Sequence, residues 1–134
     1  MLVDTNLLVD VLEDDPGWAE WSISQLRSQS KVHRLIINPI IYSELSLTFS
    51  AVEAMDETLG LMEIPMVEIP EAALFLAGKA FVQYRRKGGT RTNVLGDFLI
   101  GAHAAVSGLP VLTRDARRYF PSVSLVSPDG HQHH

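Results

Sequence analysis

The sequence predicts an α/β protein in which a central parallel sheet lies between two layers of helices. Short apolar segments of strand length alternate along the chain with longer segments whose apolar residues recur at helical spacing. Such alternation is typical of strand–helix–strand units, which build parallel sheets covered by helices on both faces. The 134 residues fit a single domain, and a chain of this length buries enough surface to need no disulfide staple.

Turn and capping residues mark the helix starts in the first half of the chain. A DDPG segment breaks the chain at 14–17, and Asn38 is a good N-cap before Pro39, whose missing N–H costs nothing at the first helical position. In order, the expected elements are a strand at 1–4, helices at 5–14 and from 18 to near 28, a strand at 34–38, helices at 40–49 and 52–62, and a short strand at 66–69.

Glycines mark the helix ends in the second half. Gly88 and Gly89 are expected to end a long helix that Pro70 opens, and Gly108 to end a buried helix that Asn93 caps. The expected elements are helices at 71–87 and 94–108, a strand at 110–113, a helical turn at 114–120 and a last strand at 123–126. The domain is therefore expected over residues 1–128, and 129–134 form a polar tail that we expect to be disordered or partly an added tag.

Charge is distributed unevenly along the chain, whose net charge is −5. Residues 1–78 hold 3 basic and 13 acidic side chains, a net charge of −10, whereas residues 79–118 hold 8 basic and 2 acidic ones, a net charge of +6. The asymmetry fits either two differently solvated faces or a basic surface that binds nucleic acid. The two acids of the basic segment are Asp97 and Asp115, which favours the second interpretation.

Membrane and secreted classes are not indicated. No apolar run reaches the roughly 18 residues that a spanning helix needs, and the acidic N-terminal segment does not resemble a signal peptide. The chain has no cysteine, which excludes thiolate metal sites and suits a reducing compartment. We expect a cytoplasmic protein that does not contact a membrane.

Four acids occupy positions that suggest a common site. Asp4 ends the first strand and Asp115 follows the strand at 110–113, so both should lie at the edge where parallel sheets bind ligands. Glu44 interrupts an apolar helix, and Asp97 lies in the first turns of a buried one, where the helix dipole favours negative charge. Taken singly, Asp4, Asp97 and Asp115 could be caps, and Glu44 could lie on an exposed helix edge.

Taken together, four carboxylates at one edge of a small sheet would repel one another unless cations neutralised them. Oxygen ligands without cysteine or histidine favour Mg²⁺ or Mn²⁺. A water on such an ion can attack phosphorus, so the pattern predicts metal-assisted cleavage of a phosphodiester. Without metal, the repulsion leads us to expect that Asp4→Asn is neutral or stabilising.

Other catalytic arrangements have less support. His103 lies six positions after Asp97, on a different helix face, and is expected to be structural. The sequence contains neither a Gly-x-Ser-x-Gly motif nor a glycine-rich phosphate loop. Phosphatases that begin with an aspartate after the first strand need a second aspartate two residues later, where this chain has Asn6.

Four segments together resemble a family. MLVDTNLLVDVL, SEL, DFLIGAHA and LPVLTRDARRY, in this order, resemble a PIN-domain ribonuclease, and the size and the ending resemble the VapC-type toxins of bacterial toxin–antitoxin pairs. The resemblance implies a three-layer α/β/α sandwich and endonuclease cleavage of RNA with Mg²⁺ or Mn²⁺. Its residues would be the acidic quartet Asp4, Glu44, Asp97 and Asp115, supported by the polar side chains of Asn6 and Thr113.

The resemblance also implies partners: a homodimer and a cognate antitoxin that covers an apolar groove and blocks the acidic site. Cations that flank Asp97 and Asp115 in the sequence are expected to hold the RNA backbone, unless they only form a solvated basic face. They are Arg85, Arg86, Lys87, Arg91, Arg114 and Arg117. The alternative function is a catalytically silent PIN-like module that binds RNA or a protein.

Overall fold

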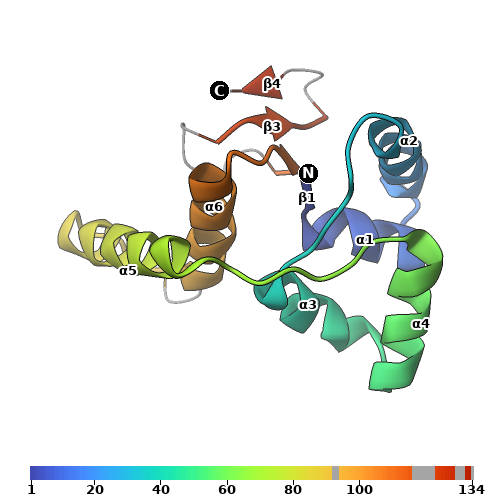
Figure 1. The fold of residues 1–134 in the computed structure, drawn as a ribbon, viewed down its shortest axis with the longest axis horizontal. Helices are drawn as coiled ribbons and strands as arrows, with labels where there is room; N and C mark the ends of the chain where they lie inside the picture. The colour runs from blue at the N-terminus through green and yellow to red at the C-terminus, as the bar shows by residue number, and fades with distance from the viewer. Residues whose placement is uncertain (92–93, 116–122, 129–131, 134) are drawn as a thin grey trace.

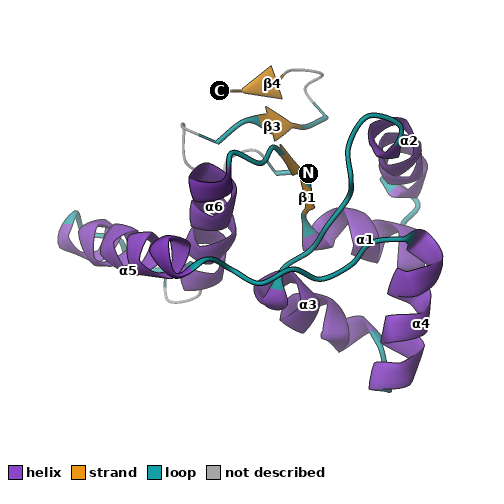
Figure 2. Cartoon of the chain, in the orientation of Figure 1, coloured by secondary structure: helices purple, strands orange, loops and turns teal. Residues whose placement is uncertain are grey.

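The computed structural model describes residues 1–91, 94–115, 123–128 and 132–133 of the chain. Its sheet has the strand order β1-β2-β3-β4, and the strands are short (Figures 1 and 2). The first three strands run parallel, and β4 runs antiparallel to β3. The strands are β1 (Leu2–Val3), β2 (Val111–Leu112), β3 (Leu125–Val126) and β4 (Gln132–His133).

Two further extended segments continue the sheet beyond β1 through single parallel bridges. Ile36 pairs with Leu2, and Ile37 pairs with Met66. These are the segments expected as strands at 34–38 and 66–69, and they are shorter than expected. Asn38 already caps the following helix and Pro65 has no N–H to donate, so each ladder ends after a few residues.

Six α-helices lie in the part of the chain that the structure describes. In Figure 1, α5 and α6 lie to the left of the strands, α1, α2 and α4 lie to the right and α3 lies below, so helices flank the strands as the expected α/β layering requires. Helix α1 contacts α2 and α3, α3 contacts α6, and α6 contacts α5. The helices are α1 (Thr5–Leu12), α2 (Ala19–Ser30), α3 (Pro39–Leu45), α4 (Val52–Met62), α5 (Glu71–Arg86) and α6 (Leu95–Ser107).

The helix expected at 40–49 is shorter than predicted. It ends at Leu45, and a 3-10 turn over Ser46–Thr48 follows it. The hydroxyl of Ser46 donates to the carbonyl of Ser43 at 2.6 Å, and such side-chain bonds compete with helix propagation. The glycine stop at 108 was predicted correctly: Gly108 adopts the left-handed conformation that ends a helix, with φ 63°.

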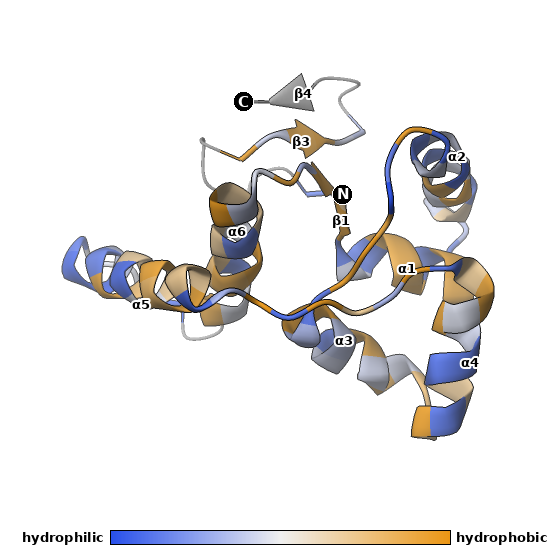
Figure 3. Ribbon diagram, viewed as in Figure 1, coloured by the Kyte–Doolittle hydropathy of each residue, from blue (hydrophilic) through white to orange (hydrophobic). Residues whose placement is uncertain are grey.

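The core lies between the sheet and the helices that flank it. Figure 3 shows β1 and β3 as hydrophobic segments, and the side chains of Leu2, Val3, Val111 and Leu112 are fully buried. A smaller cluster joins α5 to α6 through alanines, whose size allows the two helices to approach closely. No described helix is long and apolar enough to cross a membrane.

The ends of the expected elements differ most near the C-terminus. Gln132 and His133 pair with β3, although the sequence indicated a polar tail at 129–134. Most of the turn expected at 114–120, including Arg117, lies outside the described residues.

Candidate active site

Asp4 is the centre of a hydrogen-bonded group at the carboxyl ends of β1 and β2. It follows β1 directly, caps α1 and has no solvent exposure. Its Oδ1 accepts from the backbone N–H of Thr5 at 2.8 Å. Its Oδ2 accepts from the hydroxyl of Thr113 at 2.7 Å and from the amide of Asn6 at 3.3 Å. Both oxygens of this buried carboxylate are therefore held, by donors from α1 and by Thr113, which directly follows β2.

Thr5 connects Asp4 to Glu44. Its backbone N–H donates to Asp4, and its hydroxyl donates to Glu44 Oε1 at 2.6 Å. Glu44 lies near the end of α3, whose start is fixed by Asn38: the Asn38 Oδ1 accepts from the backbone N–H groups of Ile40 and Ile41, both at 3.0 Å. The structure thus brings together two acids that are forty positions apart in the sequence.

The segment after β2 carries Asp115 to the same group. The Thr113 hydroxyl donates to Asp4, and its oxygen accepts from the backbone N–H of Asp115 at 3.0 Å. The backbone N–H of Arg114 donates to Asn6 Oδ1 at 3.2 Å. Asn6 and Thr113, which were expected to be supporting polar residues, therefore link this segment to the first turn of α1.

Asp97 lies on the first turn of α6, which faces Glu44. A Cβ added at the neighbouring Gly96 would lie 3.9 Å from Glu44 Oε2, so this helix end and that carboxylate are adjacent. The side chain of Asp97 is half-buried. The helix N-terminus supplies partial positive charge for carboxylates around it.

The donor set is suited to a hard cation. Hydroxyl and carboxylate oxygens are the ligands that Mg²⁺ and Mn²⁺ prefer. Within the described residues, no three His, Asp or Glu side chains lie close enough to hold a metal ion by themselves. Mg²⁺ is ordinarily bound by one or two carboxylates and keeps several waters, so a closed protein cage is not required. That all four acids share one cation stays a prediction.

The structure adds a residue that sequence reasoning missed. Asp10 is buried in α1, and its carboxylate forms two bonds with Arg114, from Nη2 at 2.9 Å and from Nε at 3.0 Å. The available signal was its spacing, because Asp10 follows Asn6 by four residues and so shares its face of α1. Arg114 was expected to contact RNA, and the structure gives its guanidinium this other partner.

Four of the other predicted cations lie at or shortly after the end of α5. Arg85, Arg86, Lys87 and Arg91 are all exposed. The backbone N–H of Arg91 donates to the Tyr84 hydroxyl at 3.0 Å, and the Tyr84 ring meets the Phe98 ring edge-on at 5.9 Å. Since Phe98 follows Asp97, this contact holds the basic segment against the first turn of α6.

A buried histidine connects α6 to α3. His103 has a pKa below its ordinary value because burial disfavours the charged form. The Asn38 amide nitrogen lies 3.2 Å from His103 Nδ1, and since an amide nitrogen donates, Nδ1 accepts. His103 is thus structural, as the sequence indicated, and it supports the residue that caps the Glu44 helix.

Several solved structures share this fold, among them a toxin–antitoxin complex from Klebsiella pneumoniae. The chain is similar to VapBC2 from Rickettsia felis bound to a DNA fragment from their promoter, with 19% identity and a TM-score of 0.72 over 94% of this chain and 96% of that one. It is also similar to FitAcB from Neisseria gonorrhoeae, with 21% identity and a TM-score of 0.68 over 95% and 96% of the two chains.

DNA-bound VapBC from Salmonella typhimurium matches at 18% identity and a TM-score of 0.68, over 94% of this chain and 96% of that chain. At these identities the likeness shows the fold. No curated protein sequence is significantly similar to the chain. The family model described as "PIN domain" matches residues 1–124. Because this match spans most of the 134 residues, the chain belongs to the PIN-domain family.

Proposed function

We propose that this protein is a divalent-metal-dependent endoribonuclease that cleaves RNA phosphodiester bonds. The observation that carries the proposal is the buried Asp4 carboxylate, which shares Thr5 with Glu44 and Thr113 with the Asp115 segment. The group lies outside the carboxyl ends of parallel strands, where open α/β sheets bind their ligands. A single buried acid could be a helix cap. A cap alone, however, does not require that a second carboxylate accept a hydrogen bond from the first residue of the helix, as Glu44 does from Thr5.

Asp4, Glu44, Asp97 and Asp115 would hold Mg²⁺ or Mn²⁺. Such an ion, when bound, lowers the pKa of a water and stabilises charge on the phosphate. The hydroxyls of Thr5 and Thr113 orient two of the carboxylates before substrate arrives. Hydrogen-bond donors of this kind, which bind a ligating carboxylate but not the metal, keep that carboxylate in place.

RNA binding is proposed for the exposed cations at the end of α5 and beyond it. Phosphate contacts by such side chains hold the backbone without reading its sequence. The Tyr84 hydroxyl accepts from the backbone N–H of Arg91, and the Tyr84 ring contacts Phe98, which follows Asp97. These two contacts support the proposal that the basic segment lies next to the acids. The RNA contacts proposed are Arg85, Arg86, Lys87 and Arg91; the role of Arg117, outside the described residues, stays a prediction.

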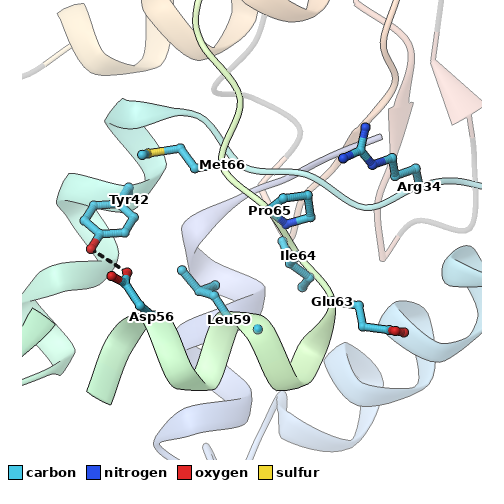
Figure 4. A pocket seen from close by; sticks show the side chains of 9 residues that line it. Arg34, Tyr42, Asp56, Leu59, Glu63, Ile64, Pro65 and Met66 are labelled. Carbon is cyan, nitrogen blue, oxygen red and sulfur yellow. Dashed lines mark hydrogen bonds between the residues drawn. The ribbon is translucent and has the colours of Figure 1, made fainter. Parts of the chain in front are cut away.

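We propose that the protein is the toxin of a toxin–antitoxin pair, binds a cognate antitoxin, forms a homodimer and acts in the cytoplasm. The partner is supported by the complexes that share the fold and by exposed apolar side chains near α3 and α4. Leu47, in the turn after α3, and Leu61, in α4, are 89% and 80% exposed. Residues of α3, of α4 and of the segment after α4 line a pocket of about 540 Å³, with Tyr42 and Asp56 at one end and Arg34 at the other (Figure 4).

The activity is tested by incubating varied RNAs with wild type and with Asp97→Asn, in Mg²⁺, in Mn²⁺ and in a chelator. We expect cleavage by wild type with metal only, and none by the variant. If both proteins leave every RNA intact, the second candidate gains: a catalytically silent PIN-like module that binds RNA or protein. The absence of three clustered ligands among the described residues is the observation that favours it.

The toxin assignment is tested separately through the adjacent reading frame. A short neighbouring gene for a DNA-binding protein is expected, and its product should suppress the ribonuclease when the two are purified together. A neighbouring product that binds the chain without lowering cleavage would contradict this assignment and leave the nuclease intact.

A further inference from the structure

We propose that Asp10 and Arg114 are positioning residues, a buried ion pair that sets the place of Asp115 beside Asp4. The inference rests on the proposed function, because its effect is measured on metal binding and RNA cleavage. It assigns to Arg114 a role different from the RNA contact that the sequence suggested.

The ion pair is built as a rigid contact. Both Asp10 oxygens are used, by Arg114 Nη2 at 2.9 Å and by Nε at 3.0 Å, and the buried Ser22 hydroxyl also donates to Asp10 at 3.0 Å. The Arg114 guanidinium lies over the Trp18 ring, 5.2 Å from its centroid. The side chain of Asp10 is only 3% exposed and that of Arg114 33%. A two-point bond against an aromatic face restricts a guanidinium more than a single contact would.

Helix α1 binds both the main chain and the side chain of Arg114. Asn6 accepts from the backbone N–H of Arg114, and Asp10, one turn later on the same helix face, binds its side chain. Main chain and side chain are thus both fixed to one rigid element. Since Asn6 also donates to Asp4, α1 sets where the segment after β2 stands relative to that acid.

The residues on either side of Arg114 belong to the candidate site. Thr113 donates to Asp4, and Asp115 is one of the predicted metal ligands. A displacement of Arg114 would therefore move both neighbours, and misplacing a ligand by about 1 Å can cost roughly 100-fold in rate. The charge of Arg114 is matched by Asp10, so the pair adds no net charge beside the acids.

The test compares Asp10→Asn, Arg114→Gln and the double variant with wild type. Arg27→Gln and Glu20→Gln make the same chemical changes on exposed positions of α2 and serve as controls. Mn²⁺ affinity is measured by calorimetry without RNA, and kcat and KM are measured on an RNA that wild type cleaves. Circular dichroism establishes which variants fold, and the double variant leaves no unpaired buried charge, so it stays informative if a single variant does not fold.

We expect each variant of the pair to lower Mn²⁺ affinity and kcat by about 10–100-fold, the range for residues that orient ligands, with KM for RNA unchanged. The double variant should be no worse than the worse single one, because either change already releases the segment. The controls should match wild type.

The positioning role is overturned if Asp10→Asn keeps wild-type Mn²⁺ affinity and kcat, and equally if Arg114→Gln acts only by raising KM, since that identifies a phosphate contact. Failure of the proposed function is a different result: wild type itself would neither bind Mn²⁺ nor cleave RNA.

Discussion

Asp4 shows how a carboxylate is kept in a fully buried place at the end of a strand. Its two oxygens accept from one backbone N–H, one hydroxyl and one amide, which replace much of the water that it loses. Repulsion among the four acids predicts that Asp4→Asn is neutral or stabilising without metal. The hydrogen bonds in the structure change that expectation, because the side-chain amide of asparagine has one oxygen and cannot accept at the places of both Oδ1 and Oδ2.

We therefore expect Asp4→Asn to lower the free energy of unfolding by about 1–3 kcal/mol in metal-free buffer, the cost of leaving buried donors unsatisfied. Urea unfolding measures it, with Glu13→Gln, on an exposed residue of the same region, as the control. An Asp4→Asn protein as stable as wild type would show that repulsion between the acids outweighs the hydrogen bonds.

His103 predicts a pH dependence of stability. Its pKa is lowered in the folded protein because burial disfavours the imidazolium, so the unfolded chain takes up a proton first as the pH falls. The stabilisation of the folded state by neutral His103 is complete above about pH 6.5, the ordinary histidine pKa, and is lost progressively as the pH falls below that value. Denaturant unfolding from pH 7.5 to 5 should show a loss that His103→Gln reduces; an identical loss in the variant would contradict it.

Chemistry-bearing residues were recognisable in the sequence where they stood next to a strand end. Asp4 and Asp115 follow expected apolar strands, and the rule for parallel sheets predicts that both lie at one edge, whereas Thr113 was singled out by the family resemblance. The spacing of Asp10 from Asn6 places it on the same helix face but does not reveal its partner, because an acid in the middle of a helix looks the same whether it faces solvent or an arginine more than a hundred positions away. Such a pair depends on tertiary packing, which a local sequence pattern does not predict.

Two helix boundaries followed from local chemistry, whereas strand lengths did not. Asn38 and Gly108 act on groups within a few residues, so the start of α3 and the end of α6 could be predicted. A strand also needs a partner of matching length, and the partner segments are short on this side of the sheet. This explains why the strands expected at 34–38 and 66–69 shrink to single bridges.

The end of α5 predicts how RNA binding depends on salt. Arg85→Glu with Arg86→Glu should weaken RNA binding and reduce the slope of log affinity against log salt, because fewer counterions are released. Filter binding in a metal-free salt series measures both. Arg27→Glu with Lys31→Glu makes the same charge change near the end of α2 and should leave the slope unaltered. Equal slopes for all three proteins would remove the end of α5 from the RNA footprint.

At the scale of the whole molecule, the topology explains why residues so far apart in sequence meet. The chain extends the sheet from β1 in one direction through Ile36 and Met66, and then in the other through β2 and β3. A strand where the order reverses has a crevice at its carboxyl end, and Asp4 stands at this position. The alternation of strands and helices in the sequence was sufficient to predict this edge, but not the distances among its carboxylates.

The most direct measurement is a crystal structure of the protein grown with Mn²⁺, with anomalous scattering used to locate the ion. We expect a peak within coordination distance of at least two of the carboxylates of Asp4, Glu44, Asp97 and Asp115, with waters completing the shell. Ordered carboxylates without a peak among them, or an ion bound only elsewhere, would contradict the proposed metal site and the nuclease chemistry built on it.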